Sequence, residues 1–137
     1  MRHRAVWPAR AALAALLAAT LSCGDVVGPL AGSVSVRLDG PVAVRSAQFR
    51  LVGAQTSVRP GPGTGFAVFT ASGGGDTLLV AVVAPVGHTL SEGALVSVQV
   101  PDVRRVSVYR VRLLEVAAAD YSLRDEAMFT LTLGPAK

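Results

Sequence analysis

The sequence predicts an all-β domain, an antiparallel β-sandwich of about seven strands. Apolar and polar residues alternate along most of the apolar segments, which is the period of a strand with one buried face. The candidate strands recur about every ten residues and are separated by turns rich in Gly, Pro and Asp. Beyond residue 22, no stretch has the apolar period of a helix long enough to build a core.

The first candidate strand, 33–38, shows the pattern most clearly, because Val34, Val36 and Leu38 alternate with polar residues. Asp39-Gly40-Pro41 follows with turn-forming residues. Later segments alternate in the same way, so one face of each strand is expected to point into the core. The other candidate strands are 47–52, 66–70, 78–84, 94–100, 106–116 and 128–133.

Four segments depart from plain alternation. The run 78–84, LLVAVVA, is continuously apolar, which predicts a strand covered on both faces. The segment 106–116 is long for one strand, so we expect a bend or bulge near its end. Prolines and glycines predict a loop over 59–65, RPGPGTG. The segment 117–126 has room for one helical turn and nothing longer.

The first 22 residues have the organisation of an export signal. Arg2, Arg4 and Arg10 form a basic region without acids, and 11–21 is almost wholly Ala and Leu. This apolar run has the length of a signal-peptide core and is too short to cross about 30 Å of hydrocarbon as a helix. We therefore expect an N-terminal signal peptide helix that is removed from the mature chain.

The junction Thr20-Leu21-Ser22-Cys23 resembles the lipobox of bacterial lipoproteins, with Ser22 in the position of the small residue. The resemblance implies cleavage between Ser22 and Cys23 and acylation of Cys23, which would bind membrane lipid. It divides the chain into a signal peptide (1–22), the lipidated cysteine with a flexible Gly-rich tether (23–32) and one β-sandwich domain (33–137). The alternative is ordinary signal-peptide cleavage, which would leave an unpaired thiol in an oxidising compartment.

Composition narrows the range of partners. The chain carries 13 basic and 9 acidic residues, and loss of the three arginines of the leader brings the net charge close to zero. Nucleic-acid binding is therefore not expected. Stacking of sugars or bases also lacks support, because four of the body's six aromatic residues are expected in the core on strands. These six are Phe49, Phe66, Phe69, Tyr109, Tyr121 and Phe129.

No catalytic, metal or cofactor site is expected. His88, the one histidine of the body, has no recognisable partner for general-base chemistry. The segment 61–65 contains a proline and precedes a strand, so a turn is favoured over a phosphate-binding loop. The acids around Asp120 and Asp125 lack the alternate spacing and the glycine of a calcium loop, so a solvated turn is favoured there too.

Four arginines, Arg104, Arg105, Arg110 and Arg112, could form a basic stripe. Arg110 and Arg112 share one face of a candidate strand, and the other two lie in the preceding turn. Such a stripe would attract anionic lipid or an acidic partner. The alternative is an ordinary polar sheet face whose charge is partly offset by Glu115 and Glu126.

The segment 93–100, GALVSVQV, resembles the late strands of cohesin-type β-sandwiches, which are non-catalytic modules of bacterial extracellular proteins. The resemblance spans 47–133 and implies a cohesin-like or immunoglobulin-like sandwich. Leu51-Val52-Gly53 stands where the family often has an aromatic-Asp-Pro segment, so a dockerin partner is not implied. Fold likeness alone does not transfer function.

The signal-like leader and the strand pattern together predict a lipid-anchored, non-enzymatic binding module of the bacterial cell envelope. It would face the periplasm or the cell surface and present a surface or sheet edge to a protein partner. The alternatives are a structural or assembly component of the envelope, and a secreted protein, which could be an enzyme of unfamiliar type.

Overall fold

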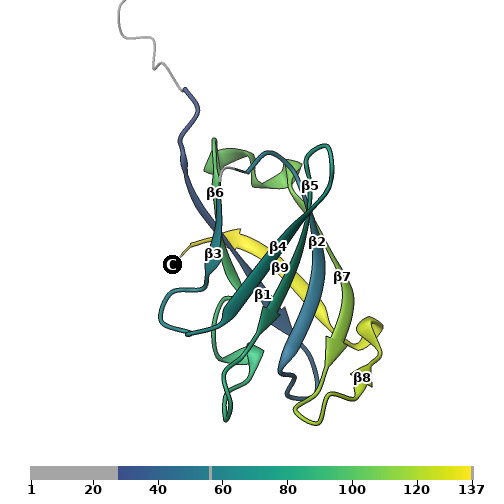
Figure 1. Cartoon of the computed structure of the whole chain (residues 1–137). Helices are drawn as coiled ribbons and strands as arrows, with labels where there is room; N and C mark the ends of the chain where they lie inside the picture. Colours follow the sequence, from purple (N-terminus) through teal and green to yellow (C-terminus); the bar gives the residue numbers. More distant parts are fainter. Residues whose placement is uncertain (1–27, 56, 137) are drawn as a thin grey trace, which may run out of the picture.

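The structure, a computed structural model, describes residues 28–55 and 57–136. Within this part the chain forms a sandwich of two antiparallel sheets, which confirms the all-β prediction (Figure 1). None of its helices is both long and apolar enough to span a bilayer. The expected signal peptide helix, Ser22, Cys23 and residues 24–27 of the tether lie outside the described residues.

The two sheets contain four and five strands. The first has the order β3-β6-β1-β9 and the second the order β4-β5-β2-β7-β8. The strands of the first sheet are β1 (Gly32–Asp39), β3 (Ser57–Pro60), β6 (Val96–Val100) and β9 (Thr130–Pro135). Those of the second are β2 (Ser46–Val52), β4 (Ala67–Gly74), β5 (Thr77–Val83), β7 (Arg110–Ala117) and β8 (Leu123–Arg124). Three short 3-10 helices join them, η1 (Leu90–Glu92), η2 (Val103–Val108) and η3 (Glu126–Met128).

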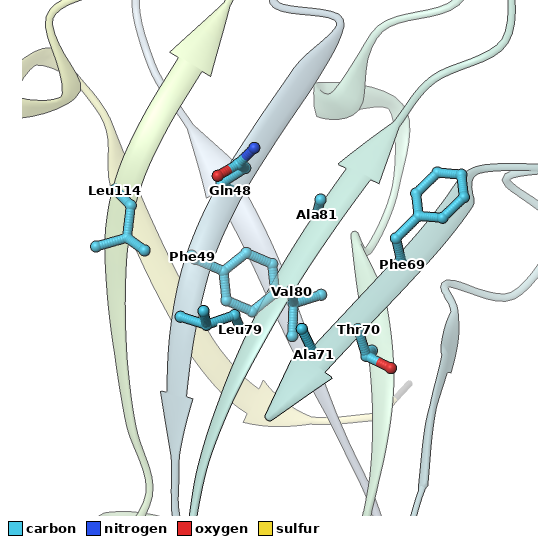
Figure 2. Close-up of a pocket in the computed structure, with 9 residues that line it drawn as sticks. All are labelled: Gln48, Phe49, Phe69, Thr70, Ala71, Leu79, Val80, Ala81 and Leu114. Atoms are coloured by element: carbon cyan, nitrogen blue, oxygen red, sulfur yellow. The ribbon is translucent and has the colours of Figure 1, made fainter. Parts of the chain in front are cut away.

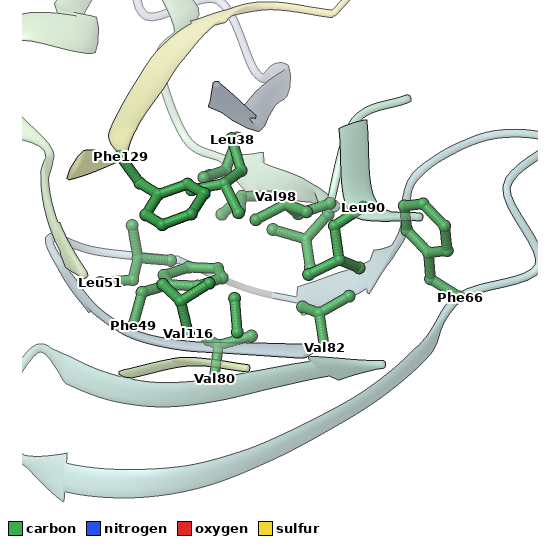
Figure 3. Packing of buried hydrophobic residues seen from close by; sticks show 14 of the residues in the cluster. Leu38, Phe49, Leu51, Phe66, Val80, Val82, Leu90, Val98, Val116 and Phe129 are labelled. Atoms are coloured by element: carbon green, nitrogen blue, oxygen red, sulfur yellow. The ribbon is translucent and has the colours of Figure 1, made fainter. Parts of the chain in front are cut away.

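The core lies between the sheets and is built from the inward half of each alternating strand. Phe49 and Leu51 of β2 are fully buried and face Val34 and Val36 of β1 across the interface. Figure 3 shows these layers, with Phe129 and Leu38 closing one side of the cluster. Each fully buried side chain of this size contributes about 1.5–3 kcal/mol relative to its exposed state. As expected, four of the six aromatic residues are buried.

The bend expected in the long segment 106–116 is present as an irregularity in β7. The register between β2 and β7 shifts at Gln48 and Phe49, which oppose Glu115 and Leu113. Leu114 is therefore the extra residue of a bulge, and its side chain is 38% exposed. A bulge strengthens the local twist and redirects side chains, so Leu114 is presented on the outside of the sheet.

The structure has more strands than the sequence predicts. The described residues form nine, because β3 and β8 were not expected. Arg59 and Pro60, assigned to a loop by their composition, belong to β3, which pairs only with β6. A proline is tolerated at this place because β3 is an edge strand, and Pro60 is its last residue.

The predicted start of the strand 106–116 is wrong. Residues 106–108 belong to η2, so β7 begins only at Arg110. The side chain of Asp102 starts this turn by accepting a hydrogen bond from the Arg104 amide at 3.0 Å, a local bond that competes with strand pairing. The segment 117–126, which was expected to hold at most one helical turn, contains only the start of one: β8 occupies Leu123–Arg124, and η3 begins at Glu126 after the capping residue Asp125.

The prediction that the apolar run 78–84 is covered on both faces is also wrong. Val80 and Val82 point into the core and are buried, whereas Leu79 and Ala81 point away from it and are partly exposed. β5 lies between β4 and β2, and only one face of this sheet is covered by the other sheet. The outward residues of the apolar run therefore form a surface.

A pair of phenylalanines tests this arrangement. Replacing the buried Phe49 with Ala should lower the free energy of unfolding by about 3–5 kcal/mol, because it leaves a cavity between the sheets. Phe69→Ala is the matched control, since Phe69 is 63% exposed, and should change stability by less than about 1 kcal/mol. Urea unfolding of both variants measures the difference, and equal losses would contradict the assignment of inner and outer faces.

Candidate binding face

The outer face of the five-stranded sheet is defined here as the outward side chains of β4, β5, β2 and β7. The strand registers arrange these residues in rows that cross the sheet. Phe69, Ala81, Gln48 and Glu115 make one row. Ala71, Leu79, Arg50 and Arg112 make the next. Each row runs from apolar residues on β4 and β5 to polar or charged residues on β2 and β7.

A shallow groove of about 270 Å³, lined mostly by apolar side chains, crosses the outer face from β4 to β7. Figure 2 shows Phe69 on β4 and Leu114 on β7 at its two sides, with the side chains of Leu79 and Ala81 between them. Phe69 is the most exposed of these, at 63%. Exposed apolar side chains that gather in one patch are typical of interaction sites.

The charged half is cationic. Arg50 and Arg112 are directly opposed on β2 and β7, and Arg110 is opposite Val52 one row further on. Among the described residues, no carboxylate forms a salt bridge with these three guanidinium groups. Glu115 is opposite Gln48 in the neighbouring row. Like charges directly opposed across two strands destabilise a sheet, so an anionic partner would relieve a repulsion that the fold contains.

The apolar half ends at a sheet edge. β4 pairs with β5 on one side, and no strand of the described chain pairs with its other side. Its residues 67–74, AVFTASGG, include no charged residue and no proline, which are the usual protection of an edge strand. The strand ends in a tight hairpin where Gly74 and Gly75 have φ of 92° and 54°, a conformation that glycine adopts without strain.

The structure divides the expected basic stripe. Arg110 and Arg112 lie on the outer face, whereas Arg104 and Arg105 belong to η2 at one end of the sandwich. Arg50 joins the outer-face group and was not in the expected stripe. Its outward position follows from the alternation in 47–52, but its place opposite Arg112 depends on strand pairing, which sequence alone did not reveal.

His88 has a carboxylate partner that the sequence did not indicate. Its Nδ1 lies 2.8 Å from Oε2 of Glu92, and both side chains are about half exposed. Hydrogen bonding to His88 is the main cause that lowers the pKa of Glu92. The other oxygen of Glu92 accepts a hydrogen bond from the Thr89 amide at 3.2 Å, so the pair is tied to the start of η1.

The acids considered for calcium make local turn contacts. Oδ1 of Asp120 accepts hydrogen bonds from the amide and hydroxyl of Ser122, at 3.0 and 2.6 Å, and these bonds lower its pKa. Asp125 accepts from the amide of Ala127 at 3.0 Å. Within residues 28–55 and 57–136, no three His, Cys, Asp or Glu side chains gather as a metal site would require.

The glycine-rich segment 61–65 also makes turn contacts. The hydroxyl of Thr64 donates to the carbonyl oxygen of Gly61 at 2.7 Å, and the Gly61 amide donates to Leu95 at 3.2 Å. A Cβ on Gly61 would lie 1.8 Å from the carbonyl oxygen of Ala94, so close packing requires glycine here. The segment is held against Ala94 and Leu95, just before β6.

No protein-family model, curated protein or solved structure matches this chain.

The opposed arginines predict a charge-dependent change in stability. Arg112→Glu should raise the free energy of unfolding by about 0.2–1 kcal/mol at low salt, because it replaces a like-charge pair with an opposite-charge pair. The gain should shrink as salt screens the pair. Arg37→Glu on β1 is the control, since Arg37 is exposed and opposite Thr132. Denaturant unfolding at two salt concentrations measures both, and an equal gain in the control would contradict the pairing.

Proposed function

We propose that this chain is a lipid-anchored, non-enzymatic binding module of the bacterial cell envelope, and that its outer face binds an acidic, apolar surface of a protein partner. The observation that carries the proposal is the row in which Leu79 is followed by Arg50 and Arg112. Apolar contact and two unpaired positive charges lie side by side on one exposed face. A partner with carboxylates beside apolar side chains complements both.

The shape of the face favours a protein over a small molecule. Small-molecule sites usually enclose most of the ligand in a cavity of about 300–1,000 Å³. The groove here is smaller, at about 270 Å³, and lies on the surface of a sheet. A surface of this kind suits a partner that covers several strands at once, with apolar contacts in the centre and charged contacts at the rim.

The anchor rests on the resemblance of Thr20-Leu21-Ser22-Cys23 to a lipobox. A single acyl chain gives only marginal membrane binding, whereas two or more hold a protein stably. An acylated Cys23 would keep the domain at a membrane without a transmembrane segment. The weaker resemblance of 47–133 to cohesin-type modules agrees with a binding role, because those modules are non-catalytic.

The anchor is tested by replacing the cysteine. Cys23→Ala should release the protein from the membrane fraction, because the chain then lacks its acyl chains. Cell fractionation measures this, and mass spectrometry of the unchanged chain should find an acylated N-terminal cysteine. Ser22→Ala is the control, since it keeps a small residue before the cysteine and should stay membrane-bound. Unchanged membrane retention of Cys23→Ala would contradict the proposal.

The binding face is tested with two synthetic peptides of about 18 residues. Each forms an amphipathic helix with a leucine stripe; glutamates flank the stripe in one and lysines in the other. The glutamate peptide should shift the NMR signals of Phe69, Leu79 and Ala81, and the lysine peptide should not. Binding should weaken in the Arg50→Gln/Arg112→Gln variant and with added salt.

The control for these charges is Arg37→Gln, on the other sheet, which should bind the glutamate peptide as the unchanged chain does. Equal binding of the two peptides, or signal shifts confined to other surfaces, would contradict the proposed face.

A further inference from the structure

The residues that lead into β1 form hydrogen bonds with η2 and with Asp102, which precedes it. The Leu30 amide donates to Oδ1 of Asp102 at 3.2 Å, and the Val103 amide donates to the carbonyl oxygen of Leu30 at 2.8 Å. The Arg104 side chain donates from Nη1 to the carbonyl oxygen of Gly28 at 2.9 Å. Figure 1 shows the chain leaving the sandwich beside this helix. The segment before β1 and η2 therefore form one end of the domain, called here the tether end.

The tether end lies only a few residues from the proposed anchor. Five residue steps separate Cys23 from Gly28, and a chain extends by at most about 3.6 Å per residue, or about 18 Å over this segment. If Cys23 is acylated, Gly28 stays within that distance of the bilayer surface. The inference below therefore rests on the anchor proposed above.

The exposed side chains of the tether end are those that a membrane surface attracts. Arg104 and Arg105 are exposed in η2, and Leu30 and Val108 are 49% and 48% exposed. Arginines attract anionic headgroups, and exposed apolar side chains can enter the interfacial layer. The two kinds of side chain come from one short segment, since Val108 follows Arg105 by three residues at the end of η2.

The negative charge of the acids at the tether end only partly offsets the positive charge of its arginines. Asp102 accepts hydrogen bonds from the amides of Arg104 and Leu30, and these bonds lower its pKa, so it stays charged at neutral pH. Asp76 is in the hairpin after β4 and its carbonyl oxygen contacts the Gly53 amide, which places it at the same end. Arg110, at the start of β7, adds a third cation near Val52.

We propose that the tether end docks on an anionic phospholipid surface, with Arg104 and Arg105 at the headgroups and Val108 in the interfacial layer. β1 begins at this end and runs away from it, so the strands stand out from the bilayer. The outer face of the five-stranded sheet then opens sideways along the membrane. Docking orients the binding face, whereas the acyl anchor alone would leave the domain free to tumble.

The experiment uses single tryptophans in the processed protein, which has no tryptophan of its own because Trp7, the one tryptophan of the sequence, lies in the leader that cleavage before Cys23 removes. Val108→Trp reports on the tether end. Val86→Trp reports on the far end, because Val86 is 82% exposed in the loop that follows β5. The proteins are purified from membranes and reconstituted in vesicles of phosphatidylcholine alone or with phosphatidylglycerol, each containing brominated lipid as a quencher.

The Val108→Trp variant should show a blue shift and at least about threefold stronger quenching with phosphatidylglycerol than without it, since each docked arginine changes the docked-to-undocked ratio by roughly fivefold. The Val86→Trp variant should show neither. Adding Arg104→Gln/Arg105→Gln should remove the dependence on phosphatidylglycerol. Arg37→Gln/Arg124→Gln, which removes the same charge elsewhere, should preserve it.

The outcomes separate the docking from the anchor. If the chain does not float with vesicles, the anchor fails and the docking fails with it. If the chain floats but the two tryptophan variants are quenched alike, the docking alone is overturned. A blue shift of the Val108→Trp variant that persists in detergent and grows with protein concentration would assign the tether end to self-association, which also overturns the docking.

Discussion

The burial of one face of each main strand against the opposite sheet is the constraint on which the rest of the structure depends. A strand alternates its side chains with a period of two, so a slip of one residue would turn Phe49 and Leu51 out to solvent and bring Arg50 into the core. Because that exchange would raise the free energy of the folded state, β2 stays in register with β5 and β7. The same register decides which residues face outward, so the candidate binding face is a consequence of core packing.

This constraint explains why the candidate binding face combines two kinds of side chain. β4 and β5 bring apolar residues to the outside, because the run 78–84 has no polar residue at its outward positions. β2 and β7 bring arginines, which the pairing of Arg50 with Arg112 places in direct opposition. The fold tolerates an exposed apolar groove and a like-charge pair side by side. Neither stabilises the isolated domain, which is why we attribute both to a partner.

The proposed functions use different parts of the sandwich. At the tether end, Asp102 and Arg104 form hydrogen bonds with Leu30 and Gly28, in the segment that leads back toward Cys23. The candidate binding face lies along the side of the domain, on antiparallel strands that lead alternately toward and away from that end. The acyl chain would hold the domain at the membrane, and Arg104 and Arg105 would orient it there. The outer face would recognise the protein partner. Arg110 lies where the two surfaces meet, but Arg104 and Arg105 of η2 are distinct from the opposed pair Arg50 and Arg112. Mutation of one pair or the other can therefore separate the two roles.

The sequence by itself determined the all-β class, the inward residues of the main strands and the bulge in β7, because a period of two and turn-forming residues are local properties. It also pointed to Arg110 and Arg112 as outward charges. Only the tertiary structure decided that Leu79 and Ala81 stay partly exposed, that Arg50 opposes Arg112, and that residues 106–108 leave the sheet. Whether an apolar strand is covered on one face or two, and which charge lies opposite another, depends on segments far apart in the chain. No local pattern contains that information.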